Sequence, residues 1–512
     1  MARALPVMRA RMASGEQARG QIVADPPPAR PRESEPPTDG AGDSARPAEL
    51  GRALLHSPLL IAFAACFALA ALSAAILPTV PSYDPWAWIV WGREVFDPHL
   101  SFATGGGPSW KPLPVIFTSV FGLFGGAAPT LWVVTARAGG LLSLVAAYRL
   151  GDRLAGRLAG LIAVAGIVLT QDWAYYMFRG TSEPTLIAAS LWAVERHLSG
   201  RRGHAFAFVL AAALIRPEAW PFLGLYGIWL WRSDPRLRPL VAVGFASVPL
   251  FWFVPPWIGS GQPFLAASHA KSYNGHLGKH HVLEALRRAG DLQVLPVLIA
   301  AFVATALAWF KDRDRLTLAL FAGALSWVVL VVGMVVVGYP GLERFFLPAA
   351  GIFCVLAGVG VARVSSLAGG GARMLAAAAV LVAVSIPLTT SRISLARAQR
   401  SIADHAVTRL DQLSSAIAAV GGHRAVFPCR SSFSAVNHGV QTALAWKLHV
   451  TLGRVGTALR KPGVLFVGPH DTIDGGPAPI SAGLRRQLIA HTGAWRVYRV
   501  TRPGAATGCV GS

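Results

Sequence analysis

The residues of this sequence that are best suited to chemistry are charged side chains next to long apolar runs. Asp84, in "PSYDPWAWIVWGREVF", follows the first of these runs, and its carboxylate could remove a proton from a hydroxyl group. Charged residues at membrane depth are costly and therefore usually functional. Four cations at later boundaries could hold an anionic group such as a phosphate, namely Lys111, Arg179, Arg216 and Arg344.

Two of these residues have a plain structural alternative. Asp84 precedes Pro85, so its carboxylate could simply cap the amino-terminal end of a helix. Lys111 follows Trp110 in "GPSWKPLPV" and could anchor the chain at a membrane surface by extending its amine toward water. The sequence alone leaves both alternatives open.

A carboxylate accompanies each of the three arginines. The neighbours in sequence are Arg179 with Glu183, Arg216 with Glu218, and Glu343 with Arg344. A local ion pair would account for each arginine, and "SEP" at 182–184 also has the composition of a helix start. Three such pairs on one side of a membrane would be an unexpected scaffold. Together they could instead form a basic pocket that holds a lipid-linked phosphate.

The composition indicates that a membrane-embedded helical bundle must position these residues. Of 512 residues, 53% are hydrophobic and only 14% are charged, whereas roughly a quarter are charged in soluble proteins. The net charge of +22 would suggest a nucleic-acid partner for a soluble chain. Here, loop arginines also set membrane topology and attract phosphate or anionic headgroups, so we predict a bilayer partner and no nucleic acid.

Apolar runs of the length needed for membrane helices recur along the chain. About 20 residues are needed to cross the hydrocarbon core, and eleven runs are candidates, several of them short. They lie near 57–78, 129–149, 158–174, 183–199, 204–216, 217–232, 239–257, 292–310, 316–338, 345–363 and 373–390. The predicted fold is therefore mainly α, a polytopic bundle of about eleven spans.

The positions of basic loops predict the orientation of this bundle. Clusters of Lys and Arg all fall on one side, near 149–157, 196–202, 232–238, 311–315 and 363–373. With the amino terminus inside, that side is the cytoplasm. The outer side then receives 79–128, 173–183, the turn at Arg216, 258–291, 339–344 and the chain after about 391. We therefore predict a multi-pass plasma-membrane protein with Asp84 and Arg344 on its outer face.

Two short segments of the first outer loop are predicted not to cross the membrane. Trp86, Trp88, Trp91 and Phe96 mark a short helix that suits the headgroup level. The segment "LPVIFTSVFGLFGG", 113–126, is apolar but short. We interpret it as re-entrant or interfacial, because a full crossing there would reverse the side of every later loop.

The two ends of the chain differ from the bundle in composition. Residues 1–53 are rich in Pro, Ala and Arg without an apolar period, which predicts a disordered cytoplasmic tail. After the transmembrane part, 54–391, residues 392–512 predict a small extracytoplasmic α/β domain. Its helix-like stretches are 395–420, 434–450 and 480–491, and its β-rich runs are "RAVF", "GVLFV" and "WRVYRV".

Cysteines and a few unusual residues complete the expectations. Cys429 and Cys509 both lie in the outer domain, where an oxidising exterior permits a disulfide between them. Arg137 lies within the second span, so we expect a buried partner for it. The loop "SHAKSYNGHLGKHH", 268–281, lacks a recognisable zinc spacing and is interpreted as a lid that contacts substrate.

The layout of these motifs resembles one known superfamily. A first span, "YDPWAW" in the first outer loop, a "WKP" lead-in, "SEP" opening a span, an "RPEAW" hairpin, a late "ERFFLP" and a soluble carboxy-terminal domain look like the integral-membrane glycosyltransferases of the C-type (GT-C) superfamily. The resemblance covers about residues 55–500. It implies that 54–391 is a catalytic domain and that the donor is a polyprenyl-phosphate sugar.

The resemblance also implies roles for individual residues. By position, Asp84 corresponds to the acidic residue that acts as general base, with Glu94 and Asp97 as fallback candidates. Lys111, Arg179, Arg216 and Arg344 are candidates for the donor phosphate, Arg344 first, and Glu183, Glu218 and Glu94 for sugar hydroxyls or for orienting the arginines. Mannose and arabinofuranose donors both fit, and the acceptor is an envelope glycan, lipid or protein. Inversion at the anomeric carbon is expected, and no cofactor is required; a divalent cation is conceivable but unsupported.

Two other classes of protein compete with an enzyme. A transporter or lipid flippase should place polar groups near mid-membrane, in broken helices of a repeated half, but the polar groups here gather at one face. A membrane anchor for the outer domain would not need eleven spans. The transferase is therefore the preferred interpretation, with the transporter or flippase as the alternative.

Overall fold

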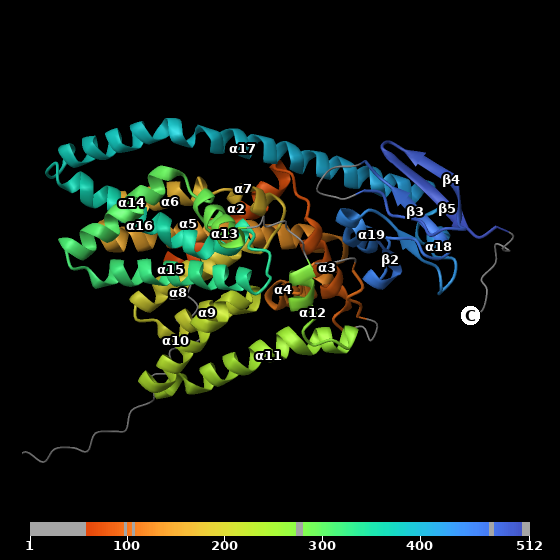
Figure 1. Cartoon of the computed structure of the whole chain (residues 1–512), viewed down its shortest axis with the longest axis horizontal. Coiled ribbons are helices and arrows are strands. Elements are labelled where there is room, and N and C mark those ends of the chain that lie inside the picture. The colour runs from red at the N-terminus through yellow and green to blue at the C-terminus, as the bar shows by residue number, and fades with distance from the viewer. Residues whose placement is uncertain (1–57, 97–99, 105–107, 273–279, 470–475, 504–512) are drawn as a thin grey trace, which may run out of the picture. The chain divides into compact units, whose positions relative to one another are not determined.

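The structure is a computed structural model that describes residues 58–96, 100–104, 108–272, 280–469 and 476–503. Ser57–Ser512 forms one compact unit. The predicted tail, 1–53, lies outside the described residues, and so do Asp97 and Cys509. Figure 1 shows that most of the described chain is helical and that a small sheet lies near its carboxy-terminal end.

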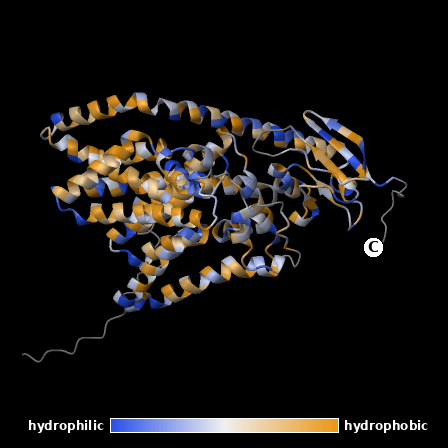
Figure 2. Cartoon of the chain, viewed as in Figure 1, coloured by the Kyte–Doolittle hydropathy of each residue, from blue (hydrophilic) through white to orange (hydrophobic). Residues whose placement is uncertain are grey.

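A helix forms at each of the eleven predicted apolar runs. These helices are α2 (Pro58–Ile76), α5 (Ala128–Ala155), α6 (Arg157–Val168), α8 (Glu183–Leu198), α9 (Arg202–Ile215), α10 (Trp220–Ser233), α11 (Arg238–Ser260), α14 (Leu295–Phe310), α15 (Arg315–Val336), α16 (Leu347–Ser366) and α17 (Ala372–Ala419). Figure 2 shows that most of their length is hydrophobic. The prediction of a mainly α membrane bundle is confirmed.

Fewer of these helices have the full length of a membrane crossing. Among the described residues, six helical segments are long and apolar enough, and a seventh crossing results if α13 (His281–Asp291) and α14, bent by 94°, count as one span. Five helices, α6, α8, α9, α10 and α14, have 12 to 16 residues. Two breaks bound some of these helices: Gly156, at φ 84°, separates α5 from α6, and Arg216–Pro217 separates α9 from α10. The chain is a multi-pass membrane protein.

Helix α16 forms the centre of the bundle. It packs against α14, α6, α15 and α5, and 89% of its apolar window is buried. Small residues allow this close packing, as is usual in membrane helices. A Cβ at Gly358 would lie 2.1 Å from the carbonyl oxygen of Ala159, and one at Gly360 would lie 2.0 Å from that of Ala300. Neither glycine can therefore be replaced without moving a helix.

Shorter helices connect the bundle. They are α3 (Tyr83–Glu94), α4 (Pro112–Phe121), α7 (Trp173–Phe178), α12 (Leu265–Ser272) and the 3₁₀ turns η1 (Gly122–Ala127), η2 (Pro217–Ala219), η3 (Pro235–Leu237) and η4 (Glu343–Phe346). Arg137 has the buried partners that we expected, because it donates to Ser73 Oγ at 3.0 Å and to the carbonyl oxygen of Pro78 at 2.6 Å. These bonds attach the end of α2, just before α3, to α5.

The first outer loop forms the short helices that we predicted, but its tryptophans are buried. Trp86, Trp88 and Trp91 are at most 7% exposed, while Phe96 is exposed. The reason is that α3 packs between α4 and α19 (Gln441–Lys447) of the carboxy-terminal part, a contact that no pattern in the sequence predicts. Helix α4 has 10 residues, about half the length of a crossing.

The carboxy-terminal part is an α/β structure that follows the long helix α17. Its sheet has the order β2-β1-β3-β5-β4, with β1 parallel to β2 and β3, and β5 antiparallel to β3 and β4. The elements are α18 (Gly422–Val426), β1 (Ser434–Ala435), η5 (His438–Val440), α19, η6 (Leu452–Arg454), β2 (Val455–Gly456), β3 (Gly463–Val467), β4 (Arg485–Thr492) and β5 (Trp495–Thr501).

Some local predictions for this part are correct and others are wrong. The runs "GVLFV" and "WRVYRV" are strands β3 and β5. However, "RAVF" lies mostly in helix α18, and the helix predicted for 480–491 is instead strand β4, because pairing with β5 overrides its helix-forming composition. Predicted segments 373–390 and 395–420 are one continuous helix, α17, which crosses the predicted boundary at 391/392.

The cysteines divide as expected between two environments. Cys66 and Cys354 are free and buried in the bundle. Cys429 is disulfide-bonded, and Cys509, its predicted partner, lies outside the described residues.

Candidate active site

The first turn of α3 places Asp84 beside η4. The Ser82 amide donates to the carbonyl oxygen of Arg179 at 2.9 Å, which holds the start of α3 against the α7–α8 connection. The N-cap position of α3 is Ser82, and Asp84 lies within the helix. The helix-cap alternative for Asp84 is therefore wrong, and its carboxylate oxygen Oδ2 instead lies 3.5 Å from Nη1 of Arg344 in η4.

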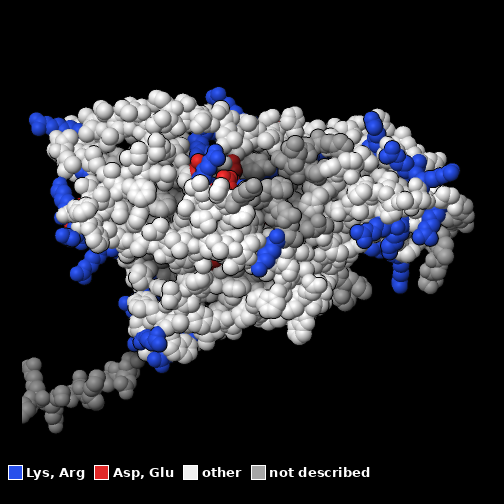
Figure 3. All heavy atoms as spheres, viewed as in Figure 1, with Lys and Arg blue, Asp and Glu red and all other residues white. Residues whose placement is uncertain are grey.

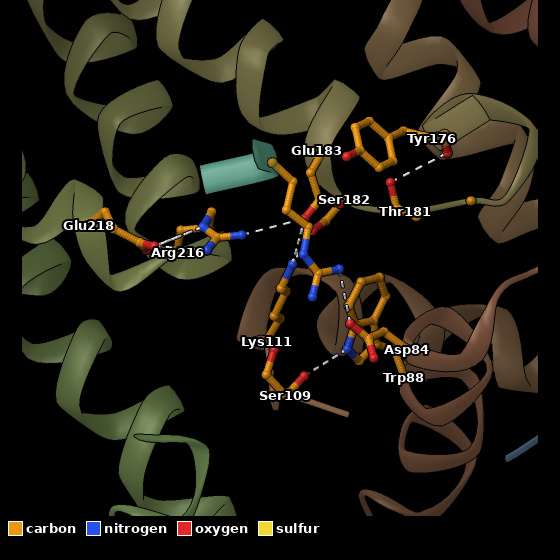
Figure 4. Close-up of polar contacts among 12 residues, drawn as sticks. Asp84, Trp88, Ser109, Lys111, Tyr176, Thr181, Ser182, Glu183, Arg216 and Glu218 are labelled. Atoms are coloured by element: carbon orange, nitrogen blue, oxygen red, sulfur yellow. Dashed lines mark hydrogen bonds and ion pairs between the residues drawn. The ribbon is translucent and has the colours of Figure 1, made fainter. Parts of the chain in front are cut away.

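A buried network of charges lies next to this ion pair. Lys111, immediately before α4, donates from Nζ to Ser182 Oγ at 2.7 Å and to Glu183 Oε1 at 3.3 Å. Arg216, between α9 and η2, contacts Glu183 Oε1 at 3.5 Å and Glu218 Oε1 at 2.8 Å. The side chains of all four charged residues are at most 7% exposed. Figure 4 shows Lys111 and Arg216 converging on Glu183.

The local ion pairs suggested by sequence therefore form in only one case. Arg216 pairs with Glu218 as its sequence neighbour. Glu183 pairs with Lys111 and Arg216 from other elements, while Glu343 contacts Arg288 and its neighbour Arg344 contacts Asp84. Most of the ion pairs thus join residues that are distant in the sequence.

Lys111 and Arg216 each lie over an aromatic ring. Nζ of Lys111 lies 5.0 Å from the centre of a Trp88 ring, and the guanidinium carbon of Arg216 lies 3.9 Å from that of Phe345. Such contacts stabilise desolvated cations. Burial lowers the pKa of Lys111 to about 8; the nearby Glu183 acts in the opposite direction, and Arg216 and Arg344 lower it further. Lys111 is therefore a cation that would gain from binding a further negative charge.

All charged residues of the Asp84–Arg344 pair and the buried network except Glu183 line a cavity of about 360 Å³. Its polar lining includes Asp84, Lys111, Arg216, Glu218 and Arg344. Much of the remaining lining is apolar and aromatic, with Trp220, Trp252, Phe253, Phe264, Met334 and Leu342. A molecule with an anionic group joined to an apolar chain matches this division.

The carboxy-terminal part contributes residues to the same cavity that sequence reasoning missed. His438 lines it and packs against Tyr83, with ring centres 4.5 Å apart and ring planes tilted by 45°. The Tyr83 hydroxyl donates to Oε1 of buried Gln441 at 3.1 Å, and Oγ1 of Thr442 donates to the Tyr83 carbonyl oxygen at 3.0 Å. Burial lowers the pKa of His438, although Asp84 opposes this effect, and the lowered pKa favours the neutral imidazole. No short motif marks His438, because its position depends on packing between segments that are far apart in the sequence.

Three of the predicted candidates, Glu94, Arg179 and Glu183, are not among the residues that line the cavity. Glu94, at the end of α3, is buried and pairs with Arg93 at 3.2 Å. Arg179 contributes its main-chain carbonyl to the start of α3, and its side chain is not among the residues that line the cavity. His269 of the predicted lid does line the cavity. Among the described residues, no group of three His, Cys, Asp or Glu is placed to hold a metal ion.

The arrangement brings a proton acceptor next to cations. The Asp84 carboxylate, partly open to the cavity, can accept a proton from a hydroxyl group. Lys111, Arg216 and Arg344 can stabilise negative charge that develops on a neighbouring oxygen, most effectively where water is excluded. Group transfer away from a phosphate, onto a hydroxyl, needs both functions within one cavity.

Comparison with known proteins identifies the fold. No protein-family model and no curated protein matches this chain. ArnT from Cupriavidus metallidurans bound to undecaprenyl phosphate is 14% identical with a TM-score of 0.50, covering 86% of this chain and 97% of that chain. Its apo state gives the same identity and TM-score, covering 88% and 98%. An Archaeoglobus fulgidus oligosaccharyltransferase tethered with an acceptor peptide gives 15% identity and a TM-score of 0.46, covering 78% and 65%.

The likeness to ArnT is one of fold, over most of both chains. The predicted polytopic helical bundle with a small carboxy-terminal α/β part is confirmed, and this chain shares its overall fold with ArnT. At 14% identity the likeness does not extend to individual site residues, and their roles depend on the geometry of the cavity.

Proposed function

We propose that this protein is a membrane glycosyltransferase that moves a sugar from a polyprenyl-phosphate donor to an acceptor hydroxyl on the outer face of the membrane. The observation that carries the proposal is the position of Asp84, whose carboxylate lies 3.5 Å from Arg344 in a cavity that also contains Lys111 and Arg216. The ArnT structure with undecaprenyl phosphate has the same fold, which supports this class of donor.

The cavity has a charged part and an apolar part, which supports an amphipathic donor. The phosphate would take the polar end, contacting Arg344, Lys111 and Arg216 in place of some of their present carboxylate contacts. The prenyl chain would lie along the aromatic and aliphatic wall that includes Trp220, Trp252 and Phe264. Because prenyl groups are apolar, this wall stabilises them by burial.

The proposed reaction is a single displacement. Asp84 removes the proton from an acceptor hydroxyl as its oxygen attacks the anomeric carbon of the donor sugar. The bond from that carbon to the phosphate oxygen breaks, and its electron pair remains on the lipid phosphate. Arg344, Lys111 and Arg216 stabilise this charge, while Glu183 orients Lys111 and Arg216. Attack opposite the leaving phosphate inverts the anomeric centre.

The orientation follows from the distribution of basic loops. The amino terminus is cytoplasmic, while the site and the carboxy-terminal part are extracytoplasmic. An envelope glycan, lipid or protein would therefore supply the acceptor hydroxyl. The donor sugar is a hexose or a pentose, with mannose and arabinofuranose as the two candidates.

A transfer assay tests the proposed function. Purified protein in proteoliposomes would receive radiolabelled polyprenyl-phosphate mannose or arabinofuranose together with envelope extracts as acceptors. We expect label to move from the lipid to an acceptor and polyprenyl phosphate to be released. Movement of labelled lipid between the leaflets, without release of polyprenyl phosphate, would contradict the transferase and support a flippase.

Raising the pH above about 8 should lower kcat/KM for the donor. The Lys111 ammonium, with its pKa lowered to about 8 by burial, loses its proton above that value, and a neutral amine does not attract a phosphate. We expect kcat/KM for the donor to fall by up to about tenfold per pH unit above pH 8, because kcat/KM reports ionisation of the free enzyme. The measurement is a pH profile of initial rates.

A charge-preserving variant provides the control for this pH profile. Lys111→Arg keeps its charge at all accessible pH values, so the alkaline decline should move to higher pH even if the larger side chain lowers the overall rate. An alkaline decline that stays near pH 8 in Lys111→Arg would show that another group causes it.

A further inference from the structure

The chain after Val420 carries a strong excess of positive charge. It contains 11 Lys and Arg and two Asp. Both Asp, Asp471 and Asp474, lie outside the described residues, so the described parts, 420–469 and 476–503, have no carboxylate side chain at all. Figure 3 shows blue side chains without red ones at the end of the molecule that carries the sheet. The described residues after Val420 therefore cannot form ion pairs with one another.

Four of these cations lie on the β4–β5 hairpin and all are exposed: Arg485, Arg486, Arg496 and Arg499. Strand β4 is an edge of the sheet. Arg486 lies over the ring of Tyr498, with its guanidinium carbon 5.2 Å from the ring centre. No ion pair joins any of the four to another described residue, so their guanidinium groups face solvent.

The strand register places two of these arginines on each face of the hairpin. Arg485 lies opposite Thr501, and Arg499 is two residues from Thr501, so Arg485 and Arg499 share one face of the hairpin. Arg486 lies opposite Val500 and shares the other face with Arg496. The like charges of Arg485 and Arg499, which are diagonal neighbours, repel one another, and a bound anion would remove this repulsion.

The hairpin lies far from the membrane surface. The Trp495 indole donates to the carbonyl oxygen of Arg409 in α17 at 3.0 Å, which fixes the hairpin to that helix. From Ala372, where α17 begins, to Arg409 the helix rises about 55 Å, of which the hydrocarbon core accounts for about 30 Å. The arginines are thus roughly 20 Å beyond the hydrocarbon core that α17 crosses. This separation favours a polymer in the envelope over a lipid headgroup as their partner.

We propose that the β4–β5 hairpin is a binding surface for an anionic glycan, one that bears carboxylate or phosphate groups. Guanidinium groups bind both kinds of group through paired hydrogen bonds, and a row of them fits a chain of regularly spaced anions. As an identification of the acceptor class, this inference rests on the proposed transferase function, since the glycan would then present its hydroxyl to the cavity. Binding itself requires no transfer.

A binding experiment tests the surface directly. The full-length protein in nanodiscs of zwitterionic lipid would be titrated with polygalacturonate, a carboxylate-bearing glycan, and with neutral dextran of similar length. We expect saturable, salt-sensitive binding of polygalacturonate and none of dextran. Arg485→Gln, Arg496→Gln and Arg499→Gln combined should weaken binding by about tenfold, because each exposed ion pair contributes roughly a two- to threefold change in affinity. The three corresponding Lys substitutions should retain binding, because they retain the charge.

Two control variants show whether binding belongs to the hairpin. Three exposed arginines on the α8–α9 and α10–α11 connections, changed together as Arg201→Gln, Arg232→Gln and Arg236→Gln, remove the same charge and should leave binding unchanged. Asp84→Asn should also bind normally, so failure of the transferase proposal would not affect this result. Equal binding by the hairpin variant and the parent, or binding only in nanodiscs or vesicles with anionic lipid, would overturn the proposal.

Discussion

Asp84→Asn should reduce sugar transfer by about 10² to 10⁴-fold, the usual contribution of a general base. The amide has nearly the same shape as the carboxylate but cannot take a proton from the acceptor hydroxyl. Asn also removes the carboxylate that lies 3.5 Å from Arg344, so the donor phosphate no longer competes with this carboxylate for the arginine. We therefore expect donor affinity to be kept or increased while kcat collapses. Initial rates and donor binding, measured on the same preparation, separate these two effects.

A carboxylate on the same helix provides the matched control. Glu94 was a fallback candidate for the base, but it is buried against Arg93 at the other end of α3. Glu94→Gln should therefore retain transfer within a few-fold when rates are normalised to folded protein. Full activity in Asp84→Asn, or a loss confined to Glu94→Gln, would show that the base has been assigned to the wrong carboxylate.

Membrane energetics explains why much of the site could be anticipated from sequence. Lys111, Arg216 and Arg344 interrupt apolar runs, and a charge in that setting persists only if a partner compensates it. The need for a compensating partner holds however far apart two residues lie in the sequence. Asp84 and Arg344, 260 positions apart, could therefore be assigned to one site before their contact was known. The partner of each charge could not be predicted, as Glu343 and Arg344 show by pairing with different elements.

The carboxy-terminal contribution could not be predicted for a different reason. His438 and Gln441 reach the cavity region because α19 packs on α3, a contact between two short segments without any repeated pattern. In the same part, strand β4 has many helix-forming residues, and only its register with β5 makes it a strand. Both the packing of α19 on α3 and the pairing of β4 with β5 are contacts between separate segments of the chain. Patterns within a single sequence do not predict such contacts.

Glu183 compensates the charges of two buried cations of the site, Lys111 and Arg216. It is fully buried and contacts both Lys111 and Arg216. Arg216 has a second carboxylate in Glu218, whereas Lys111 donates its other hydrogen bond to the uncharged hydroxyl of Ser182. One carboxylate of the network thus serves two cations, and its removal should affect Lys111 more than Arg216.

Glu183→Gln should accordingly lower both stability and transfer. Removing one partner of a buried ion pair costs about 3 kcal/mol or more, because the remaining charge is left uncompensated. We expect a melting temperature several degrees lower in detergent and a transfer rate reduced by at least tenfold per folded molecule, since Lys111 loses its orientation. Thermal unfolding and initial rates on the same samples measure the two effects.

A second substitution distinguishes electrostatic coupling from a general packing defect. In Glu183→Gln combined with Lys111→Met, no unpaired ammonium remains, so part of the lost stability should return while transfer stays low. Glu195→Gln, at the other end of α8, removes an equally buried carboxylate that pairs with the buried Arg196 and with the partly exposed Arg149. It should lower the melting temperature in the same way but leave transfer per folded molecule unchanged, because the cations that Glu195 contacts, unlike those of Glu183, do not line the cavity. Equal losses of transfer in the Glu183 and Glu195 variants would mean that stability alone limits activity and that Glu183 has no particular role in orienting the cations.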